Sequence, residues 1–410
     1  MEKTWRWFGK KDKITLDMLR QIGVEGIVTA LHDIPNGEVW TLEAIEELKQ
    51  YIESFNLHWS VVESLPVSEA IKYAGEDRDK LIDNYIVSIE NLGKAGVKTI
   101  CYNFMPVLDW ARTDLNYKLE DGTSTLYFDK IKFAYFDIYL LERVGAEKEY
   151  SETVLERVER LKETITEKEK EQLIDTIIVK TQGFINGNIK EGDQNPVAIF
   201  KRLLALYDGI DRDTLRSNFK YFLERIIPVC DKYDIDMCVH PDDPPCSLMG
   251  LPRIVTGEQD IEWILNAVDN PHNGLTFCAG SLSAGMHNNV PELARKFASR
   301  THFVHLRSTD TVSNGDFIEA SHLEGLGCLI EVVRIFEKVN PGLPMRVDHG
   351  RLMLDDADKG YNPGYSFHGR MLALGQMEGV IAAIKDEIDR QNNSKFIIQN
   401  KKTCSVLKEK

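Results

Sequence analysis

Short apolar segments alternate with amphipathic helical segments along most of this chain, and this alternation limits its possible folds more than any other feature. Residues 26–31 form one apolar segment, and residues 41–52 follow with Leu and Ile at helical spacing. Repeated strand–helix units of this kind predict a parallel sheet. Because such segments recur, we predict an α/β fold, a (β/α)8 TIM barrel, with strands at 4–8, 26–31, 57–63, 96–103, 235–240, 275–278, 301–307 and 343–348.

The alternation stops after the fourth predicted strand. Across residues 113–218 the pattern is helical and highly charged, as at Val154 and Val158 with Glu and Arg between them. We interpret this stretch as a helical insertion, which could serve either as a dimerisation arm or as a lid over the active site. The insertion belongs to a single barrel domain of residues 1–395, and a polar extension of residues 396–410 follows.

Composition and charge narrow the classes of function. The chain has 410 residues, enough for a large core, and 65 Asp and Glu against 50 Lys and Arg give a net charge of −15. This acidic balance argues against a nucleic-acid or membrane-surface partner. The seven cysteines include no CxxC pair, and no segment resembles a signal core or a membrane span, so we predict a cytoplasmic protein.

Four predicted strands end in side chains that commonly bind metals. These side chains are His240, Cys278, His305 and Asp348, one from each strand. Because functional groups gather at the carboxyl ends of barrel strands, we expect all four at one rim. Two imidazoles, a thiolate and a carboxylate suit a divalent metal of borderline softness. A single rim histidine is more often structural, and Cys238 is an alternative sulfur ligand, although it lies deeper in its strand.

Further polar and aromatic residues fall at or just after the predicted strand ends. His349 follows Asp348 directly, and neighbours on a strand face opposite ways, so both reach one site only if the strand has already ended near Gly350. An anionic substrate would need local arginines against the net charge, and Arg307 and Arg351 are placed for this. Each remaining residue could cap a helix, but together they would line the barrel mouth: His32, Glu63, Asn103, Trp110 and Arg112.

Several motifs at these strand ends resemble the mannonate dehydratase family. They are His-Pro-Asp-Asp-Pro-Pro (240–245), Thr-Phe-Cys-Ala-Gly-Ser-Leu (276–282), Phe-Val-His-Leu-Arg (303–307), Val-Asp-His-Gly-Arg (347–351) and Asn-Pro-Gly-Tyr (362–365). The resemblance extends over nearly the whole chain up to the polar tail. It implies a xylose-isomerase-like barrel and the dehydration of D-mannonate to 2-keto-3-deoxy-D-gluconate in hexuronate (glucuronate) catabolism.

The resemblance also implies roles for particular residues. A divalent metal, usually Mn²⁺, would be held by His240, Cys278, His305 and Asp348. Thiolate is an uncommon ligand of manganese, so Fe²⁺, Co²⁺ and Zn²⁺ stay open as alternatives. The acid/base pair would be His349 and Tyr365, with the order of acid and base left open.

We expect a small anionic sugar acid as the substrate, bound by Arg307, Arg351, His32, Asn103, Trp110 and Arg112. We also expect a homo-oligomer, a dimer or larger, with the insertion as its interface. A metal-dependent sugar isomerase or epimerase of the same barrel group is the alternative, but it would typically use more carboxylate ligands. A barrel nuclease would need a basic groove, and a sugar-binding protein would need no metal cluster.

Overall fold

Eight parallel strands close into a barrel in the computed structural model, which describes residues 1–181, 189, 192–313 and 315–406. The predicted TIM barrel is therefore confirmed. The last strand pairs with the first, and Met345 lies opposite Lys3 in that closing register. The barrel strands are β1 (Glu2–Arg6), β2 (Gly26–Thr29), β3 (His58–Glu63), β4 (Thr99–Tyr102), β7 (Asp236–Val239), β8 (Asn273–Cys278), β9 (Thr301–His305) and β12 (Pro344–Arg346).

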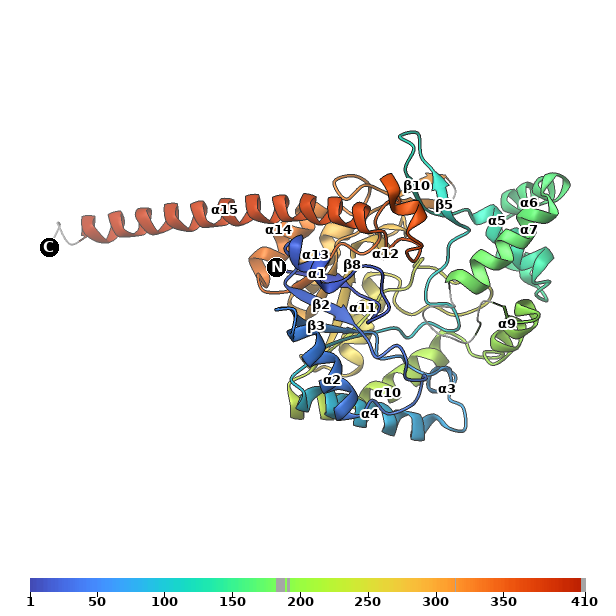
Figure 1. Ribbon diagram of the computed structural model, residues 1–410, viewed down its shortest axis with the longest axis horizontal. Coiled ribbons are helices and arrows are strands. Elements are labelled where there is room, and N and C mark those ends of the chain that lie inside the picture. The colour runs from blue at the N-terminus through green and yellow to red at the C-terminus, as the bar shows by residue number, and fades with distance from the viewer. Residues whose placement is uncertain (182–188, 190–191, 314, 407–410) are drawn as a thin grey trace.

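Helices follow most barrel strands and cover the outside of the barrel (Figure 1). In α2 the Thr41 hydroxyl caps the helix by accepting from the Ala44 amide, and Ile45, Leu48 and Ile52 are buried. The helices outside the insertion are α1 (Leu16–Gln21), α2 (Leu42–Glu53), α3 (Glu69–Lys72), α4 (Arg78–Lys94), α10 (Arg212–Tyr233), α11 (Glu258–Ala267), α12 (Ala279–Ser283), α13 (Val290–Phe297), α14 (Leu329–Val339) and α15 (Phe367–Val406), with 3-10 turns at Ala298–Arg300 and Leu354–Asp358.

The interior of the barrel is a small apolar cluster separate from the layer between strands and helices. It contains Val28, Val61, Cys101, Cys238 and Phe303. Side chains alternate along a strand, so the residue two positions after Phe303 also faces the interior, one layer closer to the carboxyl rim. The packing inside the barrel therefore determines that the side chain at the end of β9 points into the barrel mouth.

The insertion is not helical throughout, so that part of the prediction is wrong. It begins with a hairpin, β5 (Asp114–Lys118) and β6 (Ser124–Phe128), whose turn contains Asp121-Gly122. These strands join β10 (Thr309–Ser313) and β11 (Asp316–Glu319) in an antiparallel sheet of order β10-β11-β6-β5. The helices that follow gather on one side of the barrel around a core of their own (Figure 1): α5 (Lys130–Tyr135), α6 (Glu152–Thr164), α7 (Glu167–Ile174) and α9 (Pro196–Ala205), with π-helical turns at Phe136–Leu140 and Asp175–Lys180 and a 3-10 turn at Ala146–Glu149.

The chain ends in the long helix α15, whose C-terminal part projects away from the barrel (Figure 1). The helix continues through residue 396, where the sequence predicts that a polar extension starts. The helix does not mark a boundary between the barrel domain and this extension, so the boundary stays a prediction. Residues 407–410 of that extension lie outside the described residues. Among the helices that the structure describes, none combines the length and the hydrophobicity that crossing a membrane requires.

Candidate active site

Three of the predicted metal ligands meet at the carboxyl ends of adjacent barrel strands. His240 follows β7, Cys278 ends β8 and His305 ends β9. The His240 Nε2 and His305 Nδ1 atoms are 3.1 Å apart. Together with the Cys278 sulfur, these ligand atoms all lie within 4.8 Å of one another. The three side chains therefore converge on a volume that a single ion could occupy.

Asp348 joins this cluster from the end of β12. Its Oδ2 atom is 3.9 Å from His305 Nδ1 and 4.0 Å from Cys278 Sγ. The strand ends at Arg346, and Asp348 has a φ of 56°, in the left-handed region that side chains other than glycine rarely adopt. This turn removes the strand alternation, which explains how His349 can face the same cavity as Asp348.

The electrostatics of the cluster favour a positive charge at its centre. Burial alone would raise the pKa of the Cys278 thiol, but Arg307 and His240 lower it well below its ordinary value. Burial would lower the pKa of His240, yet the neighbouring Cys278 raises it to about 10. A thiolate, a carboxylate and imidazole nitrogens are the donors that a divalent metal of borderline softness prefers. The donor set and its charge therefore fit such a metal.

The alternative sulfur ligand is excluded by position. Cys238 is fully buried in the barrel interior, where its thiol donates to the Ile100 carbonyl oxygen at 3.3 Å. It does not belong to the cluster of His240, Cys278 and His305. The strand alternation that sets Cys238 one layer below the rim is the physical reason.

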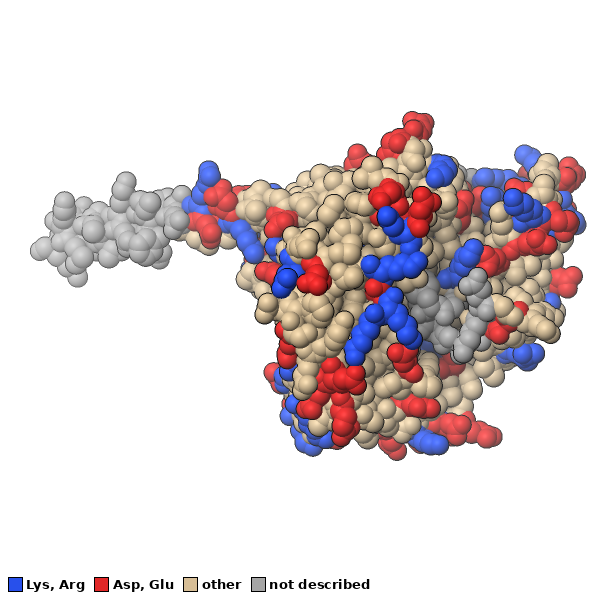
Figure 2. Space-filling model, in the orientation of Figure 1, with Lys and Arg blue, Asp and Glu red and all other residues tan. Residues whose placement is uncertain are grey.

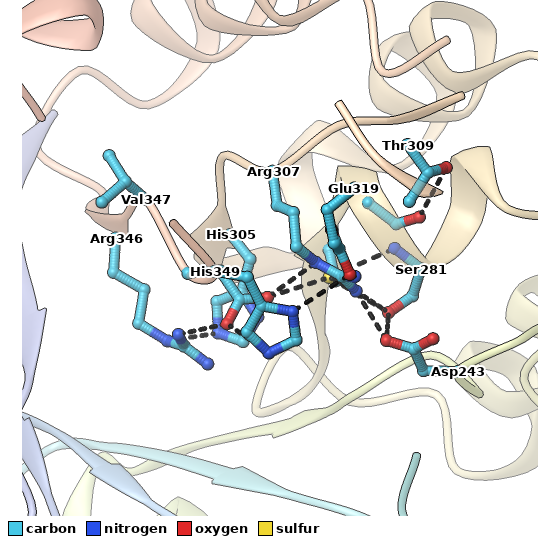
Figure 3. A network of polar contacts seen from close by, with 12 residues as sticks. Asp243, Ser281, His305, Arg307, Thr309, Glu319, Arg346, Val347 and His349 are labelled. Carbon is cyan, nitrogen blue, oxygen red and sulfur yellow. Dashed lines mark hydrogen bonds and ion pairs between the residues drawn. The ribbon is translucent and has the colours of Figure 1, made fainter. Parts of the chain in front are cut away.

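A buried network of arginines and carboxylates supports one side of the cluster (Figure 3). Arg307 contacts Asp243 and Glu319 at 2.6 Å each and Asp348 at 2.8 Å. Arg112 contacts the same Asp243 and Glu319, at 2.8 and 2.6 Å. Charges buried this deeply are tolerated because each has an oppositely charged partner.

A second buried arginine group lies on the other side of the cluster. Arg346 pairs with Asp348 at 2.5 Å and with Glu63 at 2.8 Å, and its Nε lies 3.1 Å from His305 Nε2. Arg346 and Asp348 therefore share the barrel mouth. Glu63 Oε1 also lies 3.6 Å from His305 Nε2, on the side of the ring opposite Nδ1.

The predicted acid/base pair lies beside the metal-binding cluster. The rings of His349 and Tyr365 meet edge to face, with their centroids 5.3 Å apart. The centroid of the Trp110 ring lies 5.4 Å from that of His349. These residues enclose a cavity of about 70 Å³. Its lining residues are Glu63, Asn103, Asp109, Trp110, His240, Asp243, Arg307, Arg346, Asp348, His349 and Tyr365. His240 and Asp348 thus line the same small cavity as His349 and Tyr365, the candidate proton-transfer pair.

Comparison with known proteins agrees with this geometry. The family model described as D-mannonate dehydratase (UxuA) matches residues 1–391. The chain belongs to the D-mannonate dehydratase family. It is therefore an enzyme of the hydro-lyase class, and the resemblance predicted from the motifs is confirmed.

Individual members of the family match along almost their entire length. The mannonate dehydratase of Marinomonas sp. (strain MWYL1) is 44% identical over 398 residues, covering 95% of this chain and 100% of that protein. Mannonate dehydratase 2 of Agrobacterium fabrum (strain C58 / ATCC 33970) is 40% identical, covering 95% and 99%. The crystal structure of mannonate dehydratase from Streptococcus suis serotype 2 has a TM-score of 0.76 at 32% identity, covering 95% and 96%. The family fold and this chain's fold are thus the same.

The structure places some predicted substrate-binding residues away from the cavity. Arg351 is partly exposed and pairs with Asp121 at 2.9 Å, so it does not line the cavity near His349. Arg112 is fully buried beneath the site and is held by its two carboxylates. His32 is exposed, and its ring lies 6.0 Å from Phe8. The predicted residues Asn103, Trp110 and Arg307 do line the cavity.

Sequence reasoning missed three carboxylates of the site. Asp109 lines the cavity, and burial raises its pKa. Asp243 lies within the motif at 240–245, where the sequence alone assigns it no role. Glu319 lies on β11, a strand that the apolar pattern does not reveal. Asp109 directly precedes Trp110, and Asp243 lies within the motif at 240–245. These positions are the sequence signal that could have found the two carboxylates.

The pairing of Glu63 with Arg346 makes stability depend on pH. Burial alone would raise the pKa of Glu63, but the charge of Arg346 outweighs it and lowers the pKa from 4.5 to about 2. The ionised carboxylate therefore stabilises the fold above about pH 4.5, and this contribution is lost as the pH falls toward 2. In Glu63→Gln, we expect a lower melting temperature at pH 7 and a smaller difference from the wild type near pH 3. Melting curves that stay equally far apart at both pH values would contradict this assignment.

Proposed function

We propose that this enzyme converts D-mannonate to 2-keto-3-deoxy-D-gluconate and water in a metal-dependent reaction of hexuronate (glucuronate) catabolism. The observation that carries the proposal is the convergence of His240, Cys278, His305 and Asp348 beside His349 and Tyr365, in a chain of the mannonate dehydratase family. The proposed substrate is a small anion, and acidic and basic side chains are mixed over the face seen in Figure 2. Local arginines, and not a broad basic surface, would therefore bind it.

The four clustered side chains would hold the metal. When bound, a divalent cation supplies a Lewis acid that stabilises the negative charge developing on the substrate carboxylate. Manganese is our first choice, and iron, cobalt and zinc are the alternatives, because the donor set includes a thiolate. The arginines and carboxylates around the cluster keep its ligand side chains in place.

Dehydration needs one proton to leave C2 and one to reach the departing C3 hydroxyl. Burial raises the pKa of Tyr365 to about 12, so its phenol stays protonated at neutral pH. A protonated phenol is suited to donate a proton and poorly suited to accept one. We therefore assign His349 as the base that takes the C2 proton and Tyr365 as the acid that protonates the leaving hydroxyl. The resulting enol then loses its O–H proton and gains a proton at C3, which gives the 2-keto acid.

The substrate carboxylate would lie against an arginine of the cavity. Arg307 and Arg346 both line it, whereas Arg351 does not. Both arginines are nearly fully buried and fixed by ion pairs, so they present their charge with little loss of side-chain entropy. Of the two predicted carboxylate partners, the structure therefore supports Arg307 over Arg351.

An activity assay tests the proposal. We expect enzyme supplied with Mn²⁺ to convert D-mannonate to a 2-keto-3-deoxy acid, with altronate and fructuronate as comparison substrates. Chelation of the metal should remove the activity, and added metal should restore it. Interconversion of an aldose and a ketose without loss of water from any aldonate would instead indicate a sugar isomerase.

A further inference from the structure

Glu319 lies outside the barrel sheet but contacts the proposed catalytic histidine. It is the last residue of β11 in the four-stranded sheet, and it is only 5% exposed. Its Oε1 atom is 3.1 Å from His349 Nδ1. The same oxygen accepts from Arg112 Nη2 and Arg307 Nη1, at 2.6 Å each. Figure 3 shows the Glu319 carboxylate beside the Arg307 guanidinium, with a dashed line to the His349 ring.

This contact determines which nitrogen of His349 carries the proton. Burial alone would raise the pKa of Glu319, but Arg307 and Arg112 lower it to about 2, so the side chain is a carboxylate. An ionised carboxylate can only accept a hydrogen bond. His349 Nδ1 must therefore be the donor, and the lone pair of the neutral ring is left on Nε2. Nε2 is on the side of the metal-binding cluster, 3.7 Å from Asp348 Oδ1.

We propose that Glu319 is a positioning residue for the dehydration, holding His349 in the Nδ1–H tautomer with Nε2 directed at the substrate. This inference rests on the proposed function, in which His349 removes the C2 proton. It also gives the four-stranded sheet a role in the reaction, because this sheet delivers the carboxylate that the barrel strands do not provide. A carboxylate behind a catalytic imidazole fixes both the tautomer and the ring orientation.

Replacing Glu319 with glutamine tests the proposal. The amide keeps the size of the side chain but removes the negative charge, which weakens the hydrogen bond that holds the Nδ1 proton of His349 and removes the charge that stabilises its protonated ring. We expect kcat for D-mannonate to fall by about 10²- to 10⁴-fold. Because Glu319 does not line the cavity, the bound metal per chain should stay near the wild-type value, and KM should change much less than kcat. If Glu319→Gln does not fold, Glu319→Asp draws the carboxylate back from His349 while keeping its charge, and the same loss of kcat is expected.

The matched control is Asp243→Asn. Asp243 contacts the same two arginines, Arg112 and Arg307, but among the described residues it forms no hydrogen bond or ion pair with His349. Both substitutions therefore remove one buried partner from the same arginine pair. We expect similar losses of thermal stability from the two variants and a much larger loss of kcat from Glu319→Gln. Equal losses of kcat would mean that the arginine network, and not His349, is what Glu319 supports.

A double-mutant cycle with His349→Asn separates this inference from the proposed function. If Glu319 acts through His349, then adding Glu319→Gln to His349→Asn should not lower the residual turnover further. The same fractional loss in both backgrounds would overturn the inference. Normal kcat in Glu319→Gln beside lost turnover in His349→Asn would overturn the inference alone. Normal turnover in His349→Asn would overturn the assignment of His349 as the base, and a wild-type enzyme that does not dehydrate D-mannonate would overturn the proposed function itself.

Discussion

Replacing His349 with asparagine should lower kcat for D-mannonate by about 10²- to 10⁴-fold or more, the usual contribution of a general base. The asparagine side chain can still form hydrogen bonds with its surroundings, but it is not a base and cannot take the proton from C2. The ligand atoms His240 Nε2, Cys278 Sγ and His305 Nδ1 are untouched, so the metal content should stay at the wild-type value. Steady-state kinetics and elemental analysis of the same preparation check the two halves of this prediction.

The matched control for this variant is His322→Asn. His322 is also buried, but its Nε2 contacts the backbone oxygen of Val347 at 2.7 Å, and it does not line the cavity. We expect this control to lose stability and to keep most of its turnover. If His349→Asn instead lost its metal, His349 would be a ligand, and another group would have to serve as the base.

Removing the thiolate should have an effect of similar size by a different route. In Cys278→Ala, we expect metal affinity to fall by more than about 100-fold, because even outer partners of metal ligands are worth about 10- to 100-fold. Activity should fall in parallel and return only at high metal concentration. Cys238→Ala is the control, because Cys238 lies in the barrel interior and contacts the Ile100 carbonyl.

Metal titrations that follow activity check this second prediction. The Cys238→Ala variant should titrate like the wild type. A Cys278→Ala variant that binds metal as tightly as the wild type would contradict the assignment of Cys278 as a ligand. If Cys278→Ala and Cys238→Ala gave the same metal titration curve, the Cys278 thiolate would have a role other than binding the metal.

The barrel and the convergence of the four ligand residues follow from simple rules. Strand–helix alternation predicts a parallel barrel, and side chains at the carboxyl ends of its strands must meet at one rim. His240, Cys278, His305 and Asp348 each end or follow one such strand. Local sequence patterns are enough here because the barrel geometry supplies the long-range contacts.

The parts that were missed depend on contacts that no local pattern encodes. β5–β6 and β10–β11 are short local pairs, and only β6 and β11 pair across a long sequence separation, so neither half of the small sheet shows a strong periodicity by itself. Glu319 could not be placed without this sheet. Arg351 follows a correct strand end, but the turn that begins at Asp348 directs it toward Asp121 instead of the cavity.

The role of the insertion and the oligomeric state stay predictions. The insertion forms its own apolar core, which includes Val154 and Val158 as their spacing predicts. Its hairpin completes the small sheet beside β11. This contact ties the start of the insertion to the strand that carries Glu319. Measuring the mass of the protein in solution would test the predicted homo-oligomer.

Anomalous X-ray scattering from crystals of protein purified without chelator and supplied with Mn²⁺ tests the metal site most directly. Data collected on both sides of the manganese absorption edge should show one strong peak, bounded by His240 Nε2, Cys278 Sγ, His305 Nδ1 and a carboxylate oxygen of Asp348. A map with no peak among these atoms, or with its strongest peak elsewhere in the protein, would contradict the proposal that they hold the catalytic metal.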